Sequence, residues 1–318
     1  MLTRREFVCA GAAGAALLLP GCSFFEHILH PDRPKPPPAA PGQTPTPNQL
    51  VTYLNNNAGQ VQSMEVQNLD VEVKKGLILA VGLNGWMVCQ KPRNFRMTAT
   101  MPGMGGTVAD LGSNDREFWF WMREANPPDL YYCSHADVGR VQMPFPIQPD
   151  WVLEGLGMAT ITPNDNMRVK MNARDGTIDL IEPSRSPQGQ SVYKVTTFNG
   201  PHTVSGSQPQ VVSRRLLDEK GREICAATIV QMQSDPRTGL LIPREVKFEY
   251  PSDRITMRLT LSKVTVNGNV DQSQAERLFT RPTLPNVRSV DLANYREANP
   301  TSGGPVRNAV GIFRGAGR

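Results

Sequence analysis

Hydrophobic and polar residues alternate through most of the chain between residues 63 and 266. A period of two places successive side chains on opposite faces of a β-strand, so this alternation predicts strands. The runs are short and closely joined, which favours antiparallel neighbours, since parallel strands need longer crossovers. The predicted strands cover 64–73 (with a bulge near Asn68), 77–90, 95–101, 107–111, 117–122, 130–133, 167–172, 177–182, 191–197, 211–218, 223–233, 244–250 and 254–266.

Three segments with other spacing predict short helices. Thr46 can cap the first, Pro47 suits its first turn, and Gln49 completes a capping box. The run 55–59 (Asn-Asn-Asn-Ala-Gly) is expected to end this helix. The other two predicted helices cover 149–158 and 271–279.

The N-terminus has the pattern of a bacterial export signal. Arg4 and Arg5 precede the uncharged, Ala- and Leu-rich segment 8–20. That segment is too short to cross a bilayer, which needs roughly 20 apolar residues. It ends in Leu-Pro-Gly-Cys at 19–22, which resembles a lipobox and predicts cleavage before Cys22 and lipidation of its thiol. An ordinary signal peptide followed by a chance cysteine is the alternative.

Composition then divides the chain into four parts. Eight prolines between residues 31 and 47 favour an extended polyproline II conformation, which would hold the domain away from a membrane. Residues 3–8 also resemble a twin-arginine signal. The predicted parts are a signal peptide (1–21), a lipidated cysteine with a proline-rich tether (22–45), a β domain (46–282) and a largely disordered C-terminal extension (283–318).

Net charge and cysteine content narrow the possible partners. Removing residues 1–21 takes away two arginines and one glutamate, so the formal net charge falls from +5 to +4. The basic residues are spread along the chain, which argues against a nucleic-acid partner. Cys89, Cys133 and Cys225 remain beside Cys22, and Cys89 and Cys225 could pair. Buried thiols are the favoured interpretation, because folding before export takes place in a reducing compartment.

The order of elements resembles the LolA/LolB-like lipoprotein carrier superfamily. The resemblance covers roughly residues 46–282 and rests on segments 50–55, 64–66, 92–97, 114–121, 130–133, 243–248, 264–267 and 279–282. It implies a mainly β fold: a curved antiparallel β half-barrel with short helices covering the concave face and lipid or acyl chains between. The soluble carriers lack a lipid anchor, so this chain looks more like the anchored receptor branch or a distinct envelope lipoprotein.

Large apolar residues supply candidates for such a ligand cavity. Methionine adapts to irregular apolar ligands, and the methionines are numerous for one β domain. The alternative is that these residues simply fill a core. The candidates are Met97, Met101, Phe118, Phe120, Trp151, Leu156, Met158 and Met257.

Reactive motifs are weak. Cys133, His135 and Asp137 alternate and would share one strand face, which makes them weak candidates for metal ligands, but a fourth ligand is not evident and we expect no metal. The carboxylates of Asp150, Glu154 and Glu182 have no defined separation. Arg214, Arg215 and Arg237 are interpreted as solvated charges.

The sequence thus predicts a membrane-anchored envelope lipoprotein, without enzymatic activity or cofactor, that binds a lipid, an acyl chain or a lipoprotein in an apolar cavity. Other envelope proteins are possible partners. Ser23 lacks the aspartate that commonly retains lipoproteins in the inner membrane, which favours the periplasmic face of the outer membrane. The alternative is a structural or interaction lipoprotein with a filled core, and a metal-dependent enzyme built around His135 is a third option.

Overall fold

One sheet contains most of the described chain. The computed structural model describes residues 44–76, 80–141, 149–199, 210–268 and 272–295. Within these ranges fourteen strands are hydrogen-bonded into a single sheet, in which only the pairing of β14 with β6 is parallel. Residues 1–43, which include the predicted signal peptide, Cys22 and nearly all of the predicted tether, lie outside the described part.

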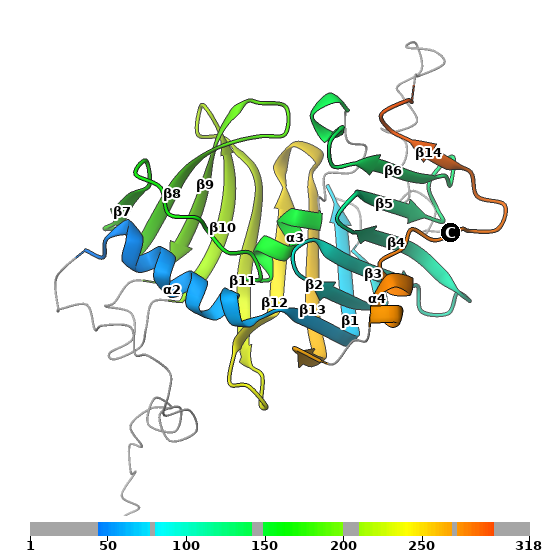
Figure 1. Cartoon of the computed structure of the whole chain (residues 1–318), viewed down its shortest axis with the longest axis horizontal. Helices are drawn as coiled ribbons and strands as arrows, with labels where there is room; N and C mark the ends of the chain where they lie inside the picture. Colours follow the sequence, from blue (N-terminus) through cyan, green and yellow to red (C-terminus); the bar gives the residue numbers. More distant parts are fainter. Residues whose placement is uncertain (1–43, 77–79, 142–148, 200–209, 269–271, 296–318) are drawn as a thin grey trace, which may run out of the picture. The chain divides into compact units, whose positions relative to one another are not determined.

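Two antiparallel meanders make up this sheet (Figure 1). The first comprises β1 (Ser63–Lys75), β2 (Val81–Gln90), β3 (Asn94–Thr100), β4 (Thr107–Ser113), β5 (Glu117–Met122) and β6 (Leu130–Ser134). The second comprises β7 (Arg168–Asn172), β8 (Thr177–Arg185), β9 (Ser191–Phe198), β10 (Val211–Asp218), β11 (Glu223–Ser234), β12 (Leu241–Tyr250) and β13 (Ile255–Val266). They join where β1 pairs with β13, while β7 and β14 (Ser289–Asp291) form the edges. The sheet is therefore open, as the predicted half-barrel requires.

The strands follow the predicted alternation closely. β10 has the predicted bounds, and the bulge expected near Asn68 is present, because the register of β1 against β2 shifts between Val66 and Leu69. β2 begins at Val81, and residues 77–79 of the predicted run lie outside the described part of the chain. Strand boundaries therefore differ from the predictions by a few residues.

The N-terminal helix α2 (Pro47–Gln60) begins as predicted. The Thr46 hydroxyl accepts a hydrogen bond from the Gln49 backbone N–H at 3.3 Å. The Gln49 side-chain oxygen accepts one from the Thr46 N–H at 2.8 Å. This reciprocal pair is a capping box, which satisfies two N–H groups that the first turn leaves without helical partners.

The prediction that residues 55–59 end this helix is wrong. Asn55 accepts from the N–H of Ile161 at 2.8 Å and donates to its carbonyl at 2.7 Å. Asn57 makes the same pair of bonds with Leu241, at 3.2 and 2.9 Å. Asparagine weakens helices by competing for its own backbone, and here both amides bind other segments instead. The helix therefore continues through the asparagine run.

Two helices cover one face of the sheet, which curves around them and is called the concave face below (Figure 1). Leu50, Val51 and Leu54 of α2 pack with Leu180 of β8 and Phe198 of β9. The second helix, α3 (Pro149–Gly155), packs in a larger buried cluster that draws residues from β1–β6 and β11–β13. Helix α4 (Gln272–Leu278) lies on the opposite face, where the Leu278 carbonyl accepts a hydrogen bond from Arg96 Nη1 at 3.1 Å.

The opposite face has a smaller apolar cluster around Trp119, Trp121 and Leu130, covered by Leu284 and Val287. The indole N–H of Trp119 donates to Asp110 at 3.2 Å. A Cβ on Gly112 would lie 2.1 Å from Cζ2 of Trp119, so only glycine leaves room for this indole. The aromatic run of β5 thus serves both faces, with Phe118 and Phe120 on the concave side.

The C-terminal part of the domain extends beyond the predicted boundary at residue 282. β14 pairs with β6, and Val290 and Leu292 belong to the concave cluster. Three residues are too few for an alternation to be recognised, which explains why this strand was not predicted. Residues 296–318 of the predicted extension lie outside the described part of the chain.

Cys89, Cys133 and Cys225 are buried free thiols, as the favoured interpretation predicted. Burial raises the pKa of all three because the thiolate would lose its hydration. The pKa of Cys225 rises to about 12, with Glu154 and Glu223 adding to the effect of burial and Lys194 opposing it. The described cysteines are therefore unreactive core residues.

We expect the free energy of unfolding to fall as the pH rises above 9. An exposed thiol ionises near its ordinary pKa of 9.0, whereas Cys225 in the folded protein ionises near 12. Its contribution is complete below pH 9 and is lost as the pH rises towards 12, at up to about 1.4 kcal/mol per pH unit. Urea unfolding at several pH values between 8 and 11 measures this decline. The Cys225→Ala variant should decline less steeply, and equal slopes would contradict the account.

Candidate functional site

Seven of the eight predicted cavity residues lie in the buried cluster of the concave face. They are Met97, Phe118, Phe120, Trp151, Leu156, Met158 and Met257. None of the seven exposes more than 7% of its surface. Met101 is the exception, because it follows the end of β3 and is only half-buried. The structure thus gathers these residues in one packed cluster, and of the seven only Trp151 also lines the charged cavity described below.

Helix α3 lies unusually close to the sheet at Gly155. A Cβ at this position would be 2.7 Å from Cε1 of Phe248 in β12 and 3.2 Å from the Cβ of Ala227 in β11. Both distances are shorter than ordinary van der Waals contact, so the helix backbone rests directly on these two strands. Glycine at this position permits the close approach.

The end of α3 turns the chain back onto the same apolar surface. The N–H of Met158 donates to the carbonyl of Leu153 and that of Gly157 to the carbonyl of Glu154, both at 3.0 Å. Gly157 has a φ of +75°, so this is the Schellman arrangement that ends many helices. It places Leu156 and Met158, each 1% exposed, in the concave cluster.

Two of the cavities lined by described residues have walls of mixed polar and apolar character. One of about 560 Å³ lies beside α4 on the opposite face, among Asn94, Asn114, Arg116 and Glu276. The other, of about 200 Å³, lies between α3 and strands β8–β10 and is called the charged cavity. Its wall includes Trp151, Ile161, Thr196 and the charged residues Glu154, Glu182, Lys194, Arg214 and Arg215.

The charged cavity borders the apolar cluster along the same rows of the sheet. Directly paired residues from β13 to β8 are Met257, Phe248, Ala227, Arg214, Thr196 and Leu180. Paired residues share a face, so this row changes from apolar to charged at β10. The neighbouring row contains Leu216, Lys194 and Glu182. Apolar and charged parts of the concave face are therefore adjacent, with α3 over both.

The charges in this cavity are only partly paired. Lys194 Nζ lies 2.5 Å from Glu154 Oε1, which joins β9 to α3. Burial raises the pKa of Glu182, with Glu154 adding to this rise and Lys194 and Arg214 opposing it. Burial lowers the pKa of Arg214, and the carboxylates of Glu154 and Glu182 oppose that change. Burial therefore disfavours the charged forms of Glu182 and Arg214, whereas the Lys194 side chain is 36% exposed and paired with Glu154.

Arg214 is the unexpected residue of the site. The interpretation of Arg214 as a solvated charge is wrong, since it exposes only 6% of its surface. Its Nε has no hydrogen-bond partner, and no carboxylate of the described residues forms an ion pair with it. The indole N–H of Trp151, in the same cavity wall, also lacks a partner. The Nε of Arg215, which also lines this cavity, lacks a partner as well, so three buried donors are unsatisfied among its lining residues.

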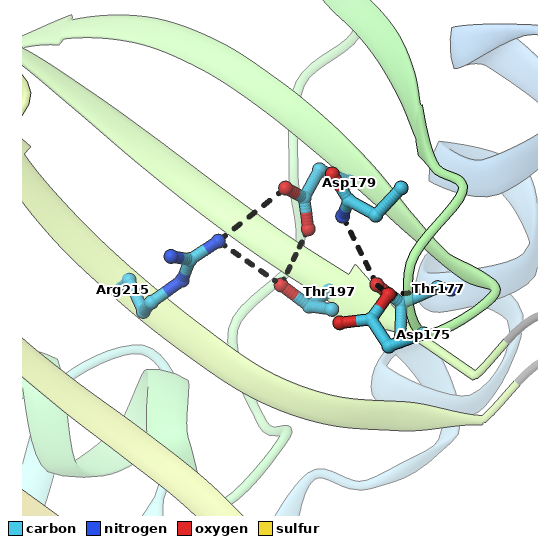
Figure 2. Close-up of polar contacts among 6 residues, drawn as sticks. Asp175, Thr177, Asp179, Thr197 and Arg215 are labelled. Atoms are coloured by element: carbon cyan, nitrogen blue, oxygen red, sulfur yellow. Dashed lines mark hydrogen bonds and ion pairs between the residues drawn. The ribbon is translucent and has the colours of Figure 1, made fainter.

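Arg215, the next residue, is engaged on the opposite face. Its guanidinium lies 3.4 Å from Asp179 of β8 and 3.4 Å from the Thr197 hydroxyl of β9 (Figure 2). Thr197 in turn donates to Asp179 at 2.6 Å. Figure 2 also shows a separate set of contacts at the turn before β8, where the Thr177 hydroxyl donates to Asp175 at 2.7 Å. Arg215 is thus a structural partner of Asp179, which leaves Arg214 as the free guanidinium.

The three candidate carboxylates separate into different environments. Asp150 forms an ion pair with Arg93 at 3.2 Å, and both side chains are more than 40% exposed. Glu154 and Glu182 both line the charged cavity. Sequence spacing predicts no relation between these two, which the curvature of the sheet and the position of α3 bring together.

The weak metal candidates do not converge. β6 ends at Ser134, so the alternation of Cys133, His135 and Asp137 does not continue along one strand. The Cys133 thiol donates to the Ser134 carbonyl, the His135 ring lies 2.8 Å from the Asn114 carbonyl oxygen, and Asp137 pairs with Arg140. Within the described residues no group of three metal-ligating side chains lies together. His202, another possible ligand, is outside the described part of the chain.

A signal for Arg214 is present in the sequence. Val212, Arg214 and Leu216 alternate with Ser213 and Arg215 along β10. This places Arg214 in phase with two apolar residues, on the buried face. The sequence interpretation gave Arg214 and Arg215 the same solvated role. The period of two instead places them on opposite faces of β10.

No protein-family model and no curated protein matches the chain, whereas solved structures do. A putative outer membrane lipoprotein-sorting protein domain from Vibrio parahaemolyticus matches with a TM-score of 0.48 and 6% identity, over 73% of this chain and 95% of that one. A DUF1329 family protein from Desulfovibrio piger has a TM-score of 0.47 and 10% identity, over 72% and 95%. A LolA superfamily protein from Nitrosomonas europaea has a TM-score of 0.44 and 12% identity, over 73% and 97%.

With 6–12% identity and TM-scores below 0.5, these solved structures say nothing of this chain's function, which is argued from its own residues. Within the described residues, no helix is long and apolar enough to span a membrane.

Proposed function

We propose that this protein is a lipid-anchored lipoprotein of the bacterial cell envelope, which binds an acyl chain against its concave face. The observation that supports this proposal is the apolar cluster beneath α3. Residues from ten strands contribute to this cluster, and a helix of seven residues lies over it. An open sheet with a broad apolar face and a small cover is suited to exchanging that cover for hydrocarbon.

The free energy gained by burying the apolar side chains of α3 is comparable to the free energy that an acyl chain would gain by burial in the same place. The apolar residues Trp151, Val152 and Leu153 of α3 are buried, and each such side chain contributes about 1.5–3 kcal/mol, or roughly 5–9 kcal/mol together. An acyl chain that buries about fourteen methylenes gains about 11 kcal/mol, at about 0.8 kcal/mol for each. An acyl chain can therefore displace the helix, with no covalent chemistry and no cofactor.

One observation favours a second function, a structural or interaction lipoprotein whose core remains filled. The seven gathered candidates are at most 7% exposed, so the protein's own side chains occupy the described concave face. The two functions differ in whether α3 leaves the sheet, and substitution of Gly155 tests this difference.

Gly155→Ala should increase acyl-chain binding. The new Cβ would lie 2.7 Å from Phe248, which weakens the packing of α3 by about 1–3 kcal/mol. A loosened cover lowers the cost of reaching the binding-competent state, so uptake of hexadecanol should become tighter and faster. Displacement of a neutral fluorescent lipid measures both quantities.

Gly112→Ala is the matched control, because its Cβ would clash with Trp119 on the opposite face. It should lower stability without changing hexadecanol uptake. Absence of hexadecanol binding in the wild-type protein and in the Gly155→Ala variant would favour the filled-core function.

The anchor is proposed from the sequence, since residues 1–43 lie outside the described part. Lipid on Cys22 and the proline-rich segment after it would hold the domain beside a membrane, with the periplasmic face of the outer membrane favoured. Lipids or lipoproteins of that membrane are the proposed partners.

Cys22→Ala should release the protein from its membrane. The variant lacks the thiol that takes the diacylglycerol, and stable anchoring needs two or more acyl chains. Fractionation of cells should therefore find wild-type protein with membranes and the variant in the soluble envelope fraction, or uncleaved. A mature variant that remains with the membrane would contradict lipidation at Cys22.

A further inference from the structure

The buried guanidinium of Arg214 has no structural role that the described residues explain. It is 6% exposed, and its Nε donates to no acceptor. Unpaired buried charges and donors are unfavourable, and they persist where they serve a ligand. Arg96 and Arg215 also have an unpartnered Nε, but their guanidinium groups bind Asp110 at 2.8 Å and Asp179 at 3.4 Å, whereas Arg214 forms no ion pair with a described residue.

The ion pairs in the charged cavity leave Arg214 available to bind a negatively charged ligand. Glu154 is occupied by Lys194, at 2.5 Å. The remaining carboxylate, Glu182, forms no ion pair with a described residue, although its charge and that of Arg214 favour each other's ionised forms. A negative charge brought by a ligand would therefore meet one buried cation without displacing an existing ion pair.

The position of Arg214 connects the charged cavity to the apolar face. Its direct partner on β11 is Ala227, which is fully buried in the concave cluster. Trp151 belongs to both regions, because it is part of the apolar cluster and also lines the charged cavity. A molecule that is apolar at one end and anionic at the other would match this order.

We propose that the charged cavity binds the anionic head, a carboxylate or a phosphate, of an amphiphile whose acyl chain lies beneath α3. This inference rests on the proposed function and specifies its ligand class. The Arg214 guanidinium is the principal partner, since its planar donors match a carboxylate or phosphate. A volume of about 200 Å³ suits such a head group and is smaller than the pockets that hold whole drug-sized ligands.

Paired probes with the same chain and different heads test this inference. The affinities of hexadecanoate and hexadecanol are measured at pH 8 by competition with a neutral fluorescent lipid. Inorganic phosphate, which has no acyl chain, is the third competitor. The wild-type protein should bind hexadecanoate at least about tenfold more tightly than hexadecanol. Phosphate alone should compete weakly or not at all.

Arg214→Met should remove this preference by weakening hexadecanoate binding and leaving hexadecanol binding unchanged. Methionine is of similar length and suits an apolar site, and replacing an unpaired buried charge should preserve or raise the melting temperature. Arg258→Met is the matched control, because it removes a partly exposed arginine that is paired elsewhere on the sheet. Arg214→Lys retains the charge without the planar donors and should keep part of the preference.

The outcomes separate the two proposals. Equal binding of hexadecanoate and hexadecanol by the wild-type protein, unchanged in the Arg214 variants, would overturn the head-group site and leave acyl-chain binding standing. Failure to bind either probe would overturn the proposed function and this inference with it. The third outcome is that inorganic phosphate binds through Arg214 and that hexadecanoate binds no more tightly than phosphate. That result would assign the cavity to a free anion and overturn the proposal of an amphiphilic ligand.

Discussion

The contact between α3 and strands β11 and β12 is the interaction on which the concave face depends. An open sheet cannot bury both of its faces by itself, and the described structure covers the middle of this face with a helix of seven residues. The backbone at Gly155 rests on Phe248 and Ala227, and the turn at Gly157 returns Leu156 and Met158 to the same surface. The cover is therefore close-fitting but short, at seven residues.

The same helix separates two chemical environments. On the β11–β13 side α3 covers apolar side chains of the sheet. On the β8–β10 side it covers the charged cavity, which Arg214 lines. Its residue Glu154 binds Lys194, while Trp151 contacts both regions. Movement of α3 would therefore open the apolar face and the charged cavity together. In the proposed function, this would couple binding of the ligand's acyl chain to binding of its anionic head group.

Much of the fold could be predicted from the sequence, because the period of two marks the strands and their faces. Phe118 and Phe120 were correctly separated from Trp119 by alternation, and Thr46 correctly marked the start of α2. The continuation of α2 depends on long-range bonds from Asn55 and Asn57, which no local pattern reveals. The charged cavity arises where the curved sheet brings Glu154 and Glu182 together, and that geometry is not encoded in spacing along the chain.

Native mass spectrometry of protein purified from its host membrane, together with the protein after extraction with organic solvent, tests the central claim most directly. The account predicts protein that retains a non-covalent ligand with the mass of an acyl-chain lipid, beyond the covalent lipid on Cys22. Extraction should remove this added mass and leave the anchored polypeptide. A single species with the mass of the polypeptide and its anchor alone, before and after extraction, would contradict the account and indicate a permanently filled core.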